Sequence, residues 1–373
     1  MKKIIGISTF VLVIIVVFSF SKNRFFISEQ LSFITSRVSD VAVRKEEAGK
    51  IAILNMDQKA NLPIKDTEFT IIDMETDEVI AQLITDLSGK VETEPLKNGR
   101  YKIIQHQVIK PYKLNKEEFI VDVSSGTNEV KVDNNVVKHV LNYKRTDEGK
   151  VQITEVLIPV APLLQLPELP NGCEITALTA VLNYYDYHVS KTEMSDNFLR
   201  KEPFIKKNGK LYGANPYKAY AGNPRSKDEG YFTYTPPILE AANQYFKTVD
   251  GDDYTLDISG SSREEIMQRL RRGVPVLIWV TLDLGKPKIK YSWYFHDTGE
   301  KFDSPINLHA VVLNGYDGKN VHVMNPLVGQ MKYNADAFFK SYTDLGSHAM
   351  VVVKKEQVKS IESLMGNKKS MGK

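Results

Sequence analysis

The sequence predicts an α+β domain in the C-terminal half of the chain, preceded by a small all-β sandwich and by an N-terminal transmembrane or signal segment. Three observations favour this order: an unbroken apolar run near the start, short strand patterns separated by turns in the middle, and mixed helix and strand patterns after about residue 156. With 373 residues, of which 42% are apolar and 25% charged, the chain is long enough for two folded domains.

The apolar run at residues 4–20 follows Lys2 and Lys3 and precedes Lys22 and Arg24. As a helix it would measure about 25 Å, the short end of what spans a bilayer. A secretory signal starts in the same way but has a shorter apolar stretch and small residues at its cleavage site. We therefore expect a signal-anchor at 1–28, with a cleaved signal peptide as the alternative. Both imply export, and the absence of a cysteine after the run excludes a lipoprotein anchor.

Short strand patterns, rich in β-branched and aromatic residues, fill the next part of the chain. They lie at 51–54, 68–72, 79–84, 101–107 and 119–123. Glycine-containing turns separate them, and no helical period runs through the stretch. We expect a small antiparallel sandwich at 48–145, with linkers at 29–47 and 146–155.

The turn Thr85-Asp86-Leu87-Ser88-Gly89 and the hairpin Leu96-Lys97-Asn98-Gly99-Arg100-Tyr101 resemble the Cna B-type, or SpaA-type, pilin domain of Gram-positive surface proteins. Many members of that family carry an isopeptide bond between a first-strand Lys and a last-strand Asn, promoted by an acidic residue. In this chain Asn55 and Met56 stand where the resemblance implies the Lys, and Gln105 stands near the acidic position. Asn142 matches the last-strand Asn. We expect no isopeptide bond and a spacer role.

Cys173 is the one cysteine of the chain, so it has no partner for an intramolecular disulfide and cannot belong to a Cys-rich zinc site. Prolines and Asn-Gly precede it, and a helical pattern runs from Glu174 onward, with an apolar stripe that begins at Ile175. Cys173 therefore lies at the start of a helix, where free N–H groups and the helix dipole are expected to lower the pKa of the thiol. The alternative is a buried structural cysteine.

His309 is the histidine best placed to serve as base among the seven. It opens the strand pattern 309–313, which runs through a Gly-Tyr-Asp-Gly turn into a second strand that ends at Asn325. A hairpin brings the two residues together, so an Asn amide could orient the ring. An ordinary strand histidine is the alternative. His322 alternates with valines in the second strand and is expected to face solvent.

Gln165 lies eight residues before the cysteine and could donate its side-chain amide to an oxyanion, unless it is a surface loop residue. Together, Gln165…Gly172-Cys173-Glu174, the run from His309 to Tyr316 and Asn325-Pro326 resemble papain-like cysteine peptidases of the bacteriocin-leader-processing type. The stand-alone secreted relatives are the more similar, although many of them have Asp at the position of Asn325.

The resemblance spans roughly 156–353 and implies an α+β papain-like fold, a helical half carrying the Cys and an antiparallel sheet carrying the His. Apolar strand patterns downstream agree with it, as does a helix pattern at 263–271. We expect the domain at 156–355 and a basic, solvated tail at 356–373. The segment 204–235, rich in Gly, Asn, Pro and Tyr, is expected to rim a cleft.

These observations predict an extracytoplasmic cysteine peptidase, with Cys173 as nucleophile, His309 as base, Asn325 orienting the base and Gln165 stabilising the oxyanion. The alternatives are an acyltransferase that cross-links surface proteins and a non-catalytic adhesin. The expected partners are a peptide or protein substrate and the membrane. No cofactor or metal is implied, and a net charge of +3 gives no reason to expect nucleic-acid binding.

Overall fold

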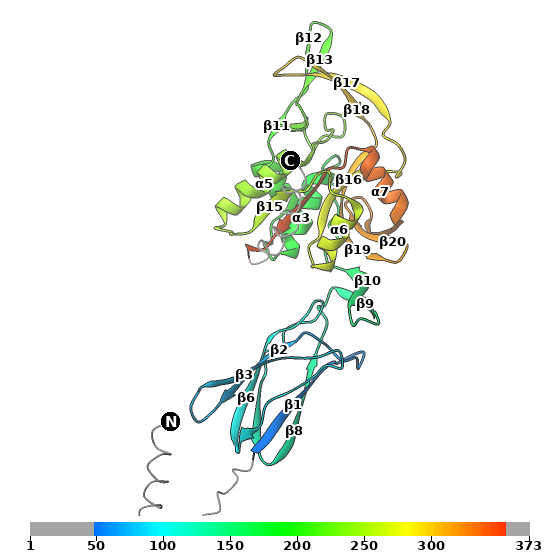
Figure 1. The fold of residues 1–373 in the computed structure, drawn as a ribbon. Coiled ribbons are helices and arrows are strands. Elements are labelled where there is room, and N and C mark those ends of the chain that lie inside the picture. Colours follow the sequence, from blue (N-terminus) through cyan, green and yellow to red (C-terminus); the bar gives the residue numbers. More distant parts are fainter. Residues whose placement is uncertain (1–47, 356–373) are drawn as a thin grey trace, which may run out of the picture. The chain divides into compact units, whose positions relative to one another are not determined.

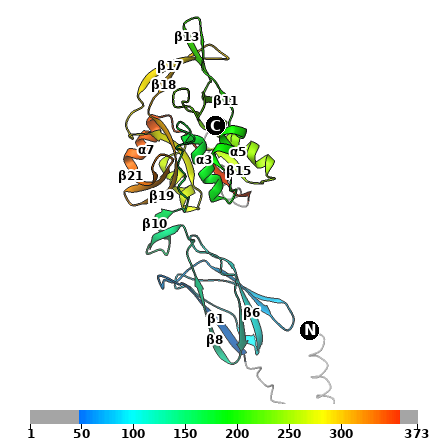
Figure 2. The same cartoon turned by 180° about the vertical axis from the view of Figure 1, so that it is seen from behind.

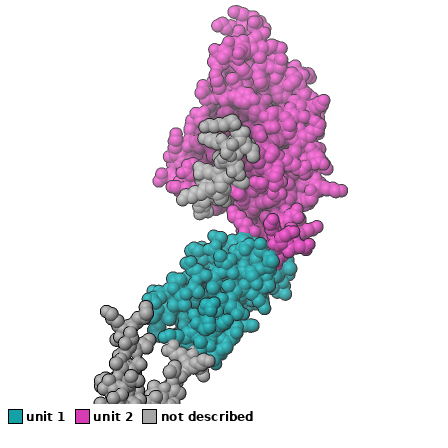
Figure 3. Space-filling view, viewed as in Figure 1, with its two compact units in different colours: residues 1–109, 114–134 teal, residues 110–113, 135–373 magenta. Residues whose placement is uncertain are grey.

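The computed structural model describes residues 48–355, which form two compact units (Figure 3). Unit 1 ends at Asn134 and excludes residues 110–113, which belong with residues 135–355 in unit 2. The predicted signal segment at 1–28, the linker at 29–47 and the tail at 356–373 lie outside the described residues. Within the described part, every helix is too short or too polar to cross a membrane.

Unit 1 is a sandwich of two four-stranded sheets. One sheet has the order β4-β1-β5, with β8 also paired to β1, and the other has the order β3-β2-β6-β7. The strands are β1 (Ala48–Asp57), β2 (Glu68–Asp73), β3 (Val79–Ile84), β4 (Lys90–Glu92), β5 (Leu96–Lys97), β6 (Gly99–Gln107), β7 (Glu118–Val123) and β8 (Gly126–Asn134). The expected all-β fold is confirmed, but the sandwich is not purely antiparallel, because β1 and β8 pair in parallel.

Alternating side chains of the two sheets build the core of unit 1, in which Ile51, Ile71 and Ile103 are fully buried. At one end of the sandwich, Gln105 and Asn134 bury their side-chain amides against each other. Each amide donates to the other's oxygen, at 2.9 Å and 2.7 Å. Asn134 closes the last strand of the sandwich, so the earlier assignment of that position to Asn142 is wrong. The expected lack of an isopeptide bond stays a prediction.

The boundary between the units lies earlier than the sequence indicated. We expected the sandwich to run to residue 145, followed by a linker at 146–155, but β9 (Val140–Arg145) and β10 (Val151–Leu157) form a hairpin that belongs to unit 2. Val140 and Val156 are buried there. The hairpin joins the second unit because the backbone of β10 pairs with the central strand β19 (Leu308–Asp317).

Unit 2 is built on an eight-stranded antiparallel sheet with the order β15-β22-β16-β19-β10-β9, and β20 and β21 continue it from β19. The remaining strands of this sheet are β15 (Tyr254–Asp257), β16 (Val276–Thr281), β20 (Asn320–Asn325), β21 (Gly329–Asn334) and β22 (Ala349–Val353). Burial is continuous along β16 and β22, which explains their unbroken apolar sequence.

Helices pack around this sheet (Figures 1 and 2). They are α3 (Cys173–Tyr184), the short α4 (Lys191–Glu193) with a following π-helical turn (Met194–Phe198), α5 (Thr235–Thr248), α6 (Arg263–Arg271) and α7 (Ala335–Asp344). Helix α3 lies against β19 and beside α5, as both views show. Ser262 and Glu265 form a reciprocal capping box that starts α6 where its sequence pattern begins.

A smaller four-stranded sheet extends from one end of unit 2 (Figure 1). Its strands are β12 (Ile205–Lys207), β13 (Lys210–Gly213), β17 (Ile289–Phe295) and β18 (Lys301–Pro305). A two-stranded pair, β11 (Lys201–Glu202) with β14 (Tyr220–Ala221), lies nearby in sequence. The expected loop region at 204–235 thus contains the short strands β12, β13 and β14, with turns between and after them.

Candidate active site

Cys173 is the first residue of α3 and is buried, with 7% of its surface exposed. Gly172 caps the helix, and its amide donates to the carbonyl of Leu169 at 3.0 Å. A Cβ on Gly172 would approach the Leu169 side chain to 2.7 Å, so the glycine is required for packing of the turn before the nucleophile. The sequence correctly placed this cysteine at a helix start, where peptide N–H groups point outward.

His309 lies near the start of β19 and faces Val280 of β16 across the sheet. Its Nε2 is 2.9 Å from Oδ1 of Asn325, the last residue of β20. Asn325 is itself fixed, because its Oδ1 accepts from the amide of Leu327 at 2.9 Å and its Nδ2 donates to the Tyr333 hydroxyl at 3.1 Å. Oδ1 is therefore the acceptor, Nε2 carries the hydrogen, and Nδ1 keeps its lone pair for a proton.

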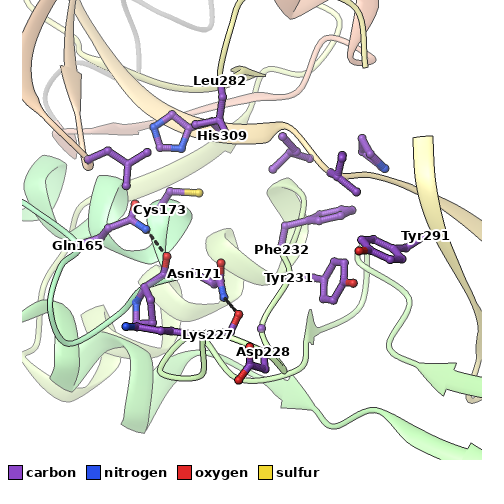
Figure 4. A pocket seen from close by; sticks show the side chains of 16 residues that line it. Gln165, Asn171, Cys173, Lys227, Asp228, Tyr231, Phe232, Leu282, Tyr291 and His309 are labelled. Atoms are coloured by element: carbon purple, nitrogen blue, oxygen red, sulfur yellow. Dashed lines mark hydrogen bonds between the residues drawn. The ribbon is translucent and has the colours of Figure 1, made fainter. Parts of the chain in front are cut away.

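The sulfur of Cys173 contacts the strand that carries the histidine. The amide of Ala310, the residue after His309, donates to Sγ at 3.5 Å. Cys173 and His309 also line the same cavity, of about 410 Å³ (Figure 4). In this state, however, the thiol donates to Oε2 of Glu174 at 3.3 Å, and no hydrogen bond joins Sγ to the ring among the described residues.

Burial dominates the electrostatics of the three groups. It raises the pKa of the Cys173 thiol well above its ordinary value, and the neighbouring Glu174 charge raises it further. It lowers the pKa of His309 to about 4, against the stabilising bond from Asn325. It raises the pKa of Glu174 to about 7. The expectation that the helix start alone lowers the thiol pKa is therefore wrong, because desolvation and an adjacent carboxylate outweigh the dipole.

Gln165 reaches the same cavity from the loop before α3 and is 3% exposed. Its Nε2 donates to the carbonyl of Pro170 at 2.7 Å, and its backbone amide donates to the carbonyl of Pro326 at 2.8 Å. The ammonium of Lys191 binds the carbonyls of Gln165 and Leu166, at 3.1 Å and 3.3 Å. The side-chain oxygen of Gln165, Oε1, is buried and has no hydrogen-bond partner among residues 48–355.

Apolar and aromatic side chains form two parts of the cavity wall, beside the polar groups already described. Tyr231 and Phe232 come from the turn-rich segment before α5, as expected for that region, and Leu282, Tyr291 and Ile306 come from the edge of the small sheet and the loops beside it. Figure 4 shows Tyr231, Phe232 and Tyr291 grouped across the cavity from Cys173 and His309. The three residues of the second set are between 41% and 51% exposed, which is unusual for large apolar side chains gathered in one place.

Across residues 48–355, no three His, Cys, Asp or Glu side chains come together in a way that could hold an ion.

Comparison with known families places both units. The profile of the Peptidase_C39 like family matches residues 157–350, which is more than half of the chain. The chain belongs to this family. The profile of the SpaA prealbumin-like fold domain matches residues 49–136, close to the observed end of unit 1. The protein is thus a stand-alone C39-like peptidase chain with a pilin-like domain before it.

Three relatives are similar to parts of the chain. The uncharacterized protein YvpB of Bacillus subtilis is 28% identical over 228 residues, covering 59% of this chain and 87% of its own. A crystal structure of a C39-like peptidase from Bacillus anthracis is 27% identical, covers 54% of this chain and 98% of its own, and gives a TM-score of 0.47. The major pilin subunit BcpA of Bacillus cereus is 20% identical over 24% of this chain and 30% of its own, with a TM-score of 0.22.

Sequence reasoning missed Glu174 as a site residue. It is fully buried beside the nucleophile, yet the sequence shows only an acidic residue in the first turn of a helix, which is common on surfaces. The one sequence signal that could have revealed it is its place inside an otherwise apolar helix pattern. In the structure, all ten residues from Cys173 to Leu182 are buried.

Proposed function

We propose that this protein is an extracytoplasmic cysteine peptidase that hydrolyses peptide bonds with Cys173 as nucleophile and His309 as base. The observation that carries the proposal is the contact of Sγ with Ala310, directly after a histidine whose Nε2 is held by Asn325. That hydrogen bond leaves Nδ1 of His309 as the basic nitrogen. Membership of the C39-like family supports a peptidase.

The first half of the reaction forms an acyl-enzyme. His309 Nδ1 takes the thiol proton, and Sγ attacks the carbonyl carbon of the scissile bond, so that a C–S bond forms and the carbonyl oxygen becomes negative. We expect the backbone N–H of Cys173, at the start of α3, and the side-chain amide of Gln165, which lines the same cavity, to donate to this oxygen. The C–N bond then breaks, and the imidazolium returns its proton to the leaving amine.

The second half regenerates the enzyme. A water molecule gives a proton to Nδ1 of His309 while its oxygen attacks the thioester carbon. The C–S bond breaks, the peptide leaves as a carboxylic acid, and the proton returns to the sulfur. Asn325 keeps the same ring nitrogen facing the sulfur in both halves, because its oxygen holds Nε2–H throughout.

The cavity favours an extended peptide with a large apolar side chain near the scissile bond. Tyr231 and Phe232 offer one apolar wall, and Leu282, Tyr291 and Ile306 offer the other. Burying an exposed apolar side chain of the substrate against these walls contributes binding energy at about 25 cal/mol per Å². The exposed Lys227 and Asp228 at the mouth add one charge of each sign, so neither acidic nor basic peptides are selected as a class.

Export is supported by two features. The basic and apolar start of the chain has the pattern of a signal-anchor or signal peptide, and the pilin-like domain is related to Gram-positive surface proteins. Together they favour action on envelope or secreted polypeptides at the cell surface, with the pilin-like domain as spacer.

The decisive experiment incubates the purified full chain with a mixed peptide library and identifies cleaved bonds by mass spectrometry. We expect cleavage that disappears in Cys173→Ala and that occurs next to large apolar residues. His296→Ala is the matched control for changes at His309, because His296 is exposed and lies away from the cavity lining. Products joined to an added amine, with little hydrolysis, would replace the peptidase by an acyltransferase. Binding of peptides without any product would replace it by an adhesin.

A further inference from the structure

Glu174 is the most unusual charged group of unit 2 outside the proposed triad. Its side chain is 0% exposed, and its two oxygens contact different neighbours. Oε2 accepts from the Cys173 thiol at 3.3 Å, and Oε1 accepts from the backbone amide of Thr233 at 3.1 Å. No lysine or arginine compensates its charge within residues 48–355. Burying a carboxyl without a cation favours its neutral, protonated form.

A purely structural role accounts for only one of these contacts. The bond to Thr233 ties α3 to the wall that carries Tyr231 and Phe232, and Trp279 secures the same residue by donating to the carbonyl of Thr233 at 2.9 Å. A tether of this kind needs one acceptor oxygen. The second oxygen instead points at the sulfur, and a carboxylate there opposes the formation of a thiolate, because two negative charges would share a water-poor site.

We propose that Glu174 acts in its protonated form as a hydrogen-bond donor to the Cys173 thiolate, so that the nucleophile forms only while this carboxyl holds its proton. The inference rests on the proposed function only in taking Cys173 as nucleophile. The proton balance is internal: the thiol proton moves to Nδ1 of His309, and Glu174 keeps its own. After acyl transfer the sulfur is neutral, and the carboxyl is unchanged.

The neighbours of Glu174 fix the direction of the pH dependence. The titratable groups around it are Cys173 on the same helix, Tyr220 on β14 and, across the cavity, His309 on β19. Burial, together with the charges of Glu174 and Cys173, raises the pKa of Tyr220 well above its ordinary value, so this phenol stays neutral. It donates to the carbonyl of Asn171. Because the pKa of Glu174 is about 7, its carboxyl is neutral below about pH 7 and does not oppose the thiolate, whereas above about pH 7 its negative charge does.

The test uses iodoacetamide on the full chain. Cys173 is the single cysteine, so the extent of labelling measured by intact mass reports this one sulfur. We expect Glu174→Gln and the wild type to react at similar rates near pH 5, where both side chains can donate. Near pH 9 we expect the variant to react about tenfold faster or more, because only the wild type then carries a second negative charge. Glu229→Gln, an exposed carboxyl one residue from the cavity wall, should match the wild type throughout.

A second variant separates hydrogen bonding from charge. Glu174→Ala removes both, so we expect it to react about tenfold more slowly than Glu174→Gln near pH 5. A rate ratio between Glu174→Gln and the wild type that stays constant from pH 5 to pH 9 would overturn the inference. So would a Glu174→Gln protein that reacts more slowly at every pH, since that result would make the carboxylate the base.

The wild type alone also provides a test if the variants do not fold. We expect its labelling rate to level off or fall above about pH 7, whereas an ordinary buried thiol would react tenfold faster with each pH unit. The latter profile would contradict the inference. Labelling requires no peptide, so a failure here leaves the cleavage experiment intact. Conversely, normal labelling without any cleavage would remove only the proposed function.

Discussion

Unit 1 buries Gln105 and Asn134 as a neutral pair, whereas unit 2 buries Cys173, Glu174 and His309, each of which can gain or lose a proton. The two amides satisfy each other with hydrogen bonds of 2.9 Å and 2.7 Å, and nothing about them depends on pH. The thiol, carboxyl and imidazole all have pKa values displaced by burial. The buried amide pair therefore stabilises unit 1, whereas the buried titratable side chains of unit 2 are available for proton transfer.

The largest expected effect is on the proton acceptor in unit 2. His309→Ala should lower kcat/KM for peptide cleavage by about 10³-fold or more, since it removes the ring that takes the thiol proton and returns it to the leaving amine. In the wild type, activity should be lost as the pH falls through about 4, where the ring becomes charged and can no longer accept a proton. A pH–rate profile on the full chain checks both statements, and an unchanged rate in His309→Ala would remove His309 from the mechanism.

The oxyanion donor should give the next largest effect. Gln165→Ala is expected to lower kcat by about 10²-fold while KM stays nearly constant, because the lost hydrogen bond forms only as the oxygen becomes negative. Gln152→Ala, an exposed glutamine on β10, serves as control. A change in KM alone would show that Gln165 only shapes the loop through its bond to Pro170.

A stability measurement sharpens the contrast between the units. The pKa of Glu174 rises from an ordinary value of 4.5 in the unfolded chain to about 7 in the folded one. The contribution of Glu174 to the free energy of unfolding is therefore fully present below pH 4.5 and is lost as the pH rises through about 7. Relative to the wild type, Glu174→Gln should become more stable between these values by roughly 3 kcal/mol. Trp279 and Trp293, the two tryptophans of the chain, both lie in unit 2, so their fluorescence follows its unfolding. A difference that does not vary with pH would contradict this assignment.

The amide pair of unit 1 should behave in the opposite way. Gln105→Leu leaves a buried Asn134 amide with its partner missing and should cost about 1–3 kcal/mol of stability at every pH, with peptide cleavage unchanged. Hydrogen exchange of β6 amides measures the loss, and the exposed Gln82→Leu on β3 is the control. Intact mass of the same samples tests for an isopeptide bond, because its formation releases ammonia.

The sequence predicted an all-β and an α+β unit, and the structure shows Cys173, His309 and Gln165 lining one cavity, with Asn325 hydrogen-bonded to His309. These predictions succeeded where local rules decide, at a helix start and across a hairpin. His322 was misjudged: alternation with valines suggested an outward side chain, but it is buried and bonds to Asp317 at 2.9 Å. Alternation cannot reveal that a sheet is covered on both faces.

The other incorrect predictions have the same cause, because a local sequence pattern does not show which distant segments pack against it. Residues 126–134 alternate weakly and carry many polar groups, so β8 and its parallel pairing with β1 were not expected. The hairpin of β9 and β10 was taken as the sandwich end and a linker, because its partner β19 lies more than 150 residues later in the chain. Likewise, a cysteine at a helix start is expected to have a lowered thiol pKa, and only the three-dimensional structure shows that a buried carboxyl lies against it.

Strand β19 carries His309 and exchanges hydrogen bonds with β16, β10 and β20, which makes it the most connected strand of unit 2. The wall with Tyr231 and Phe232 belongs instead to a turn-rich segment outside that sheet. Insertions, deletions or substitutions in that segment can therefore change the wall without moving His309, the proton acceptor. Engineers seeking a new cleavage preference should randomise this segment first and leave the central strands alone.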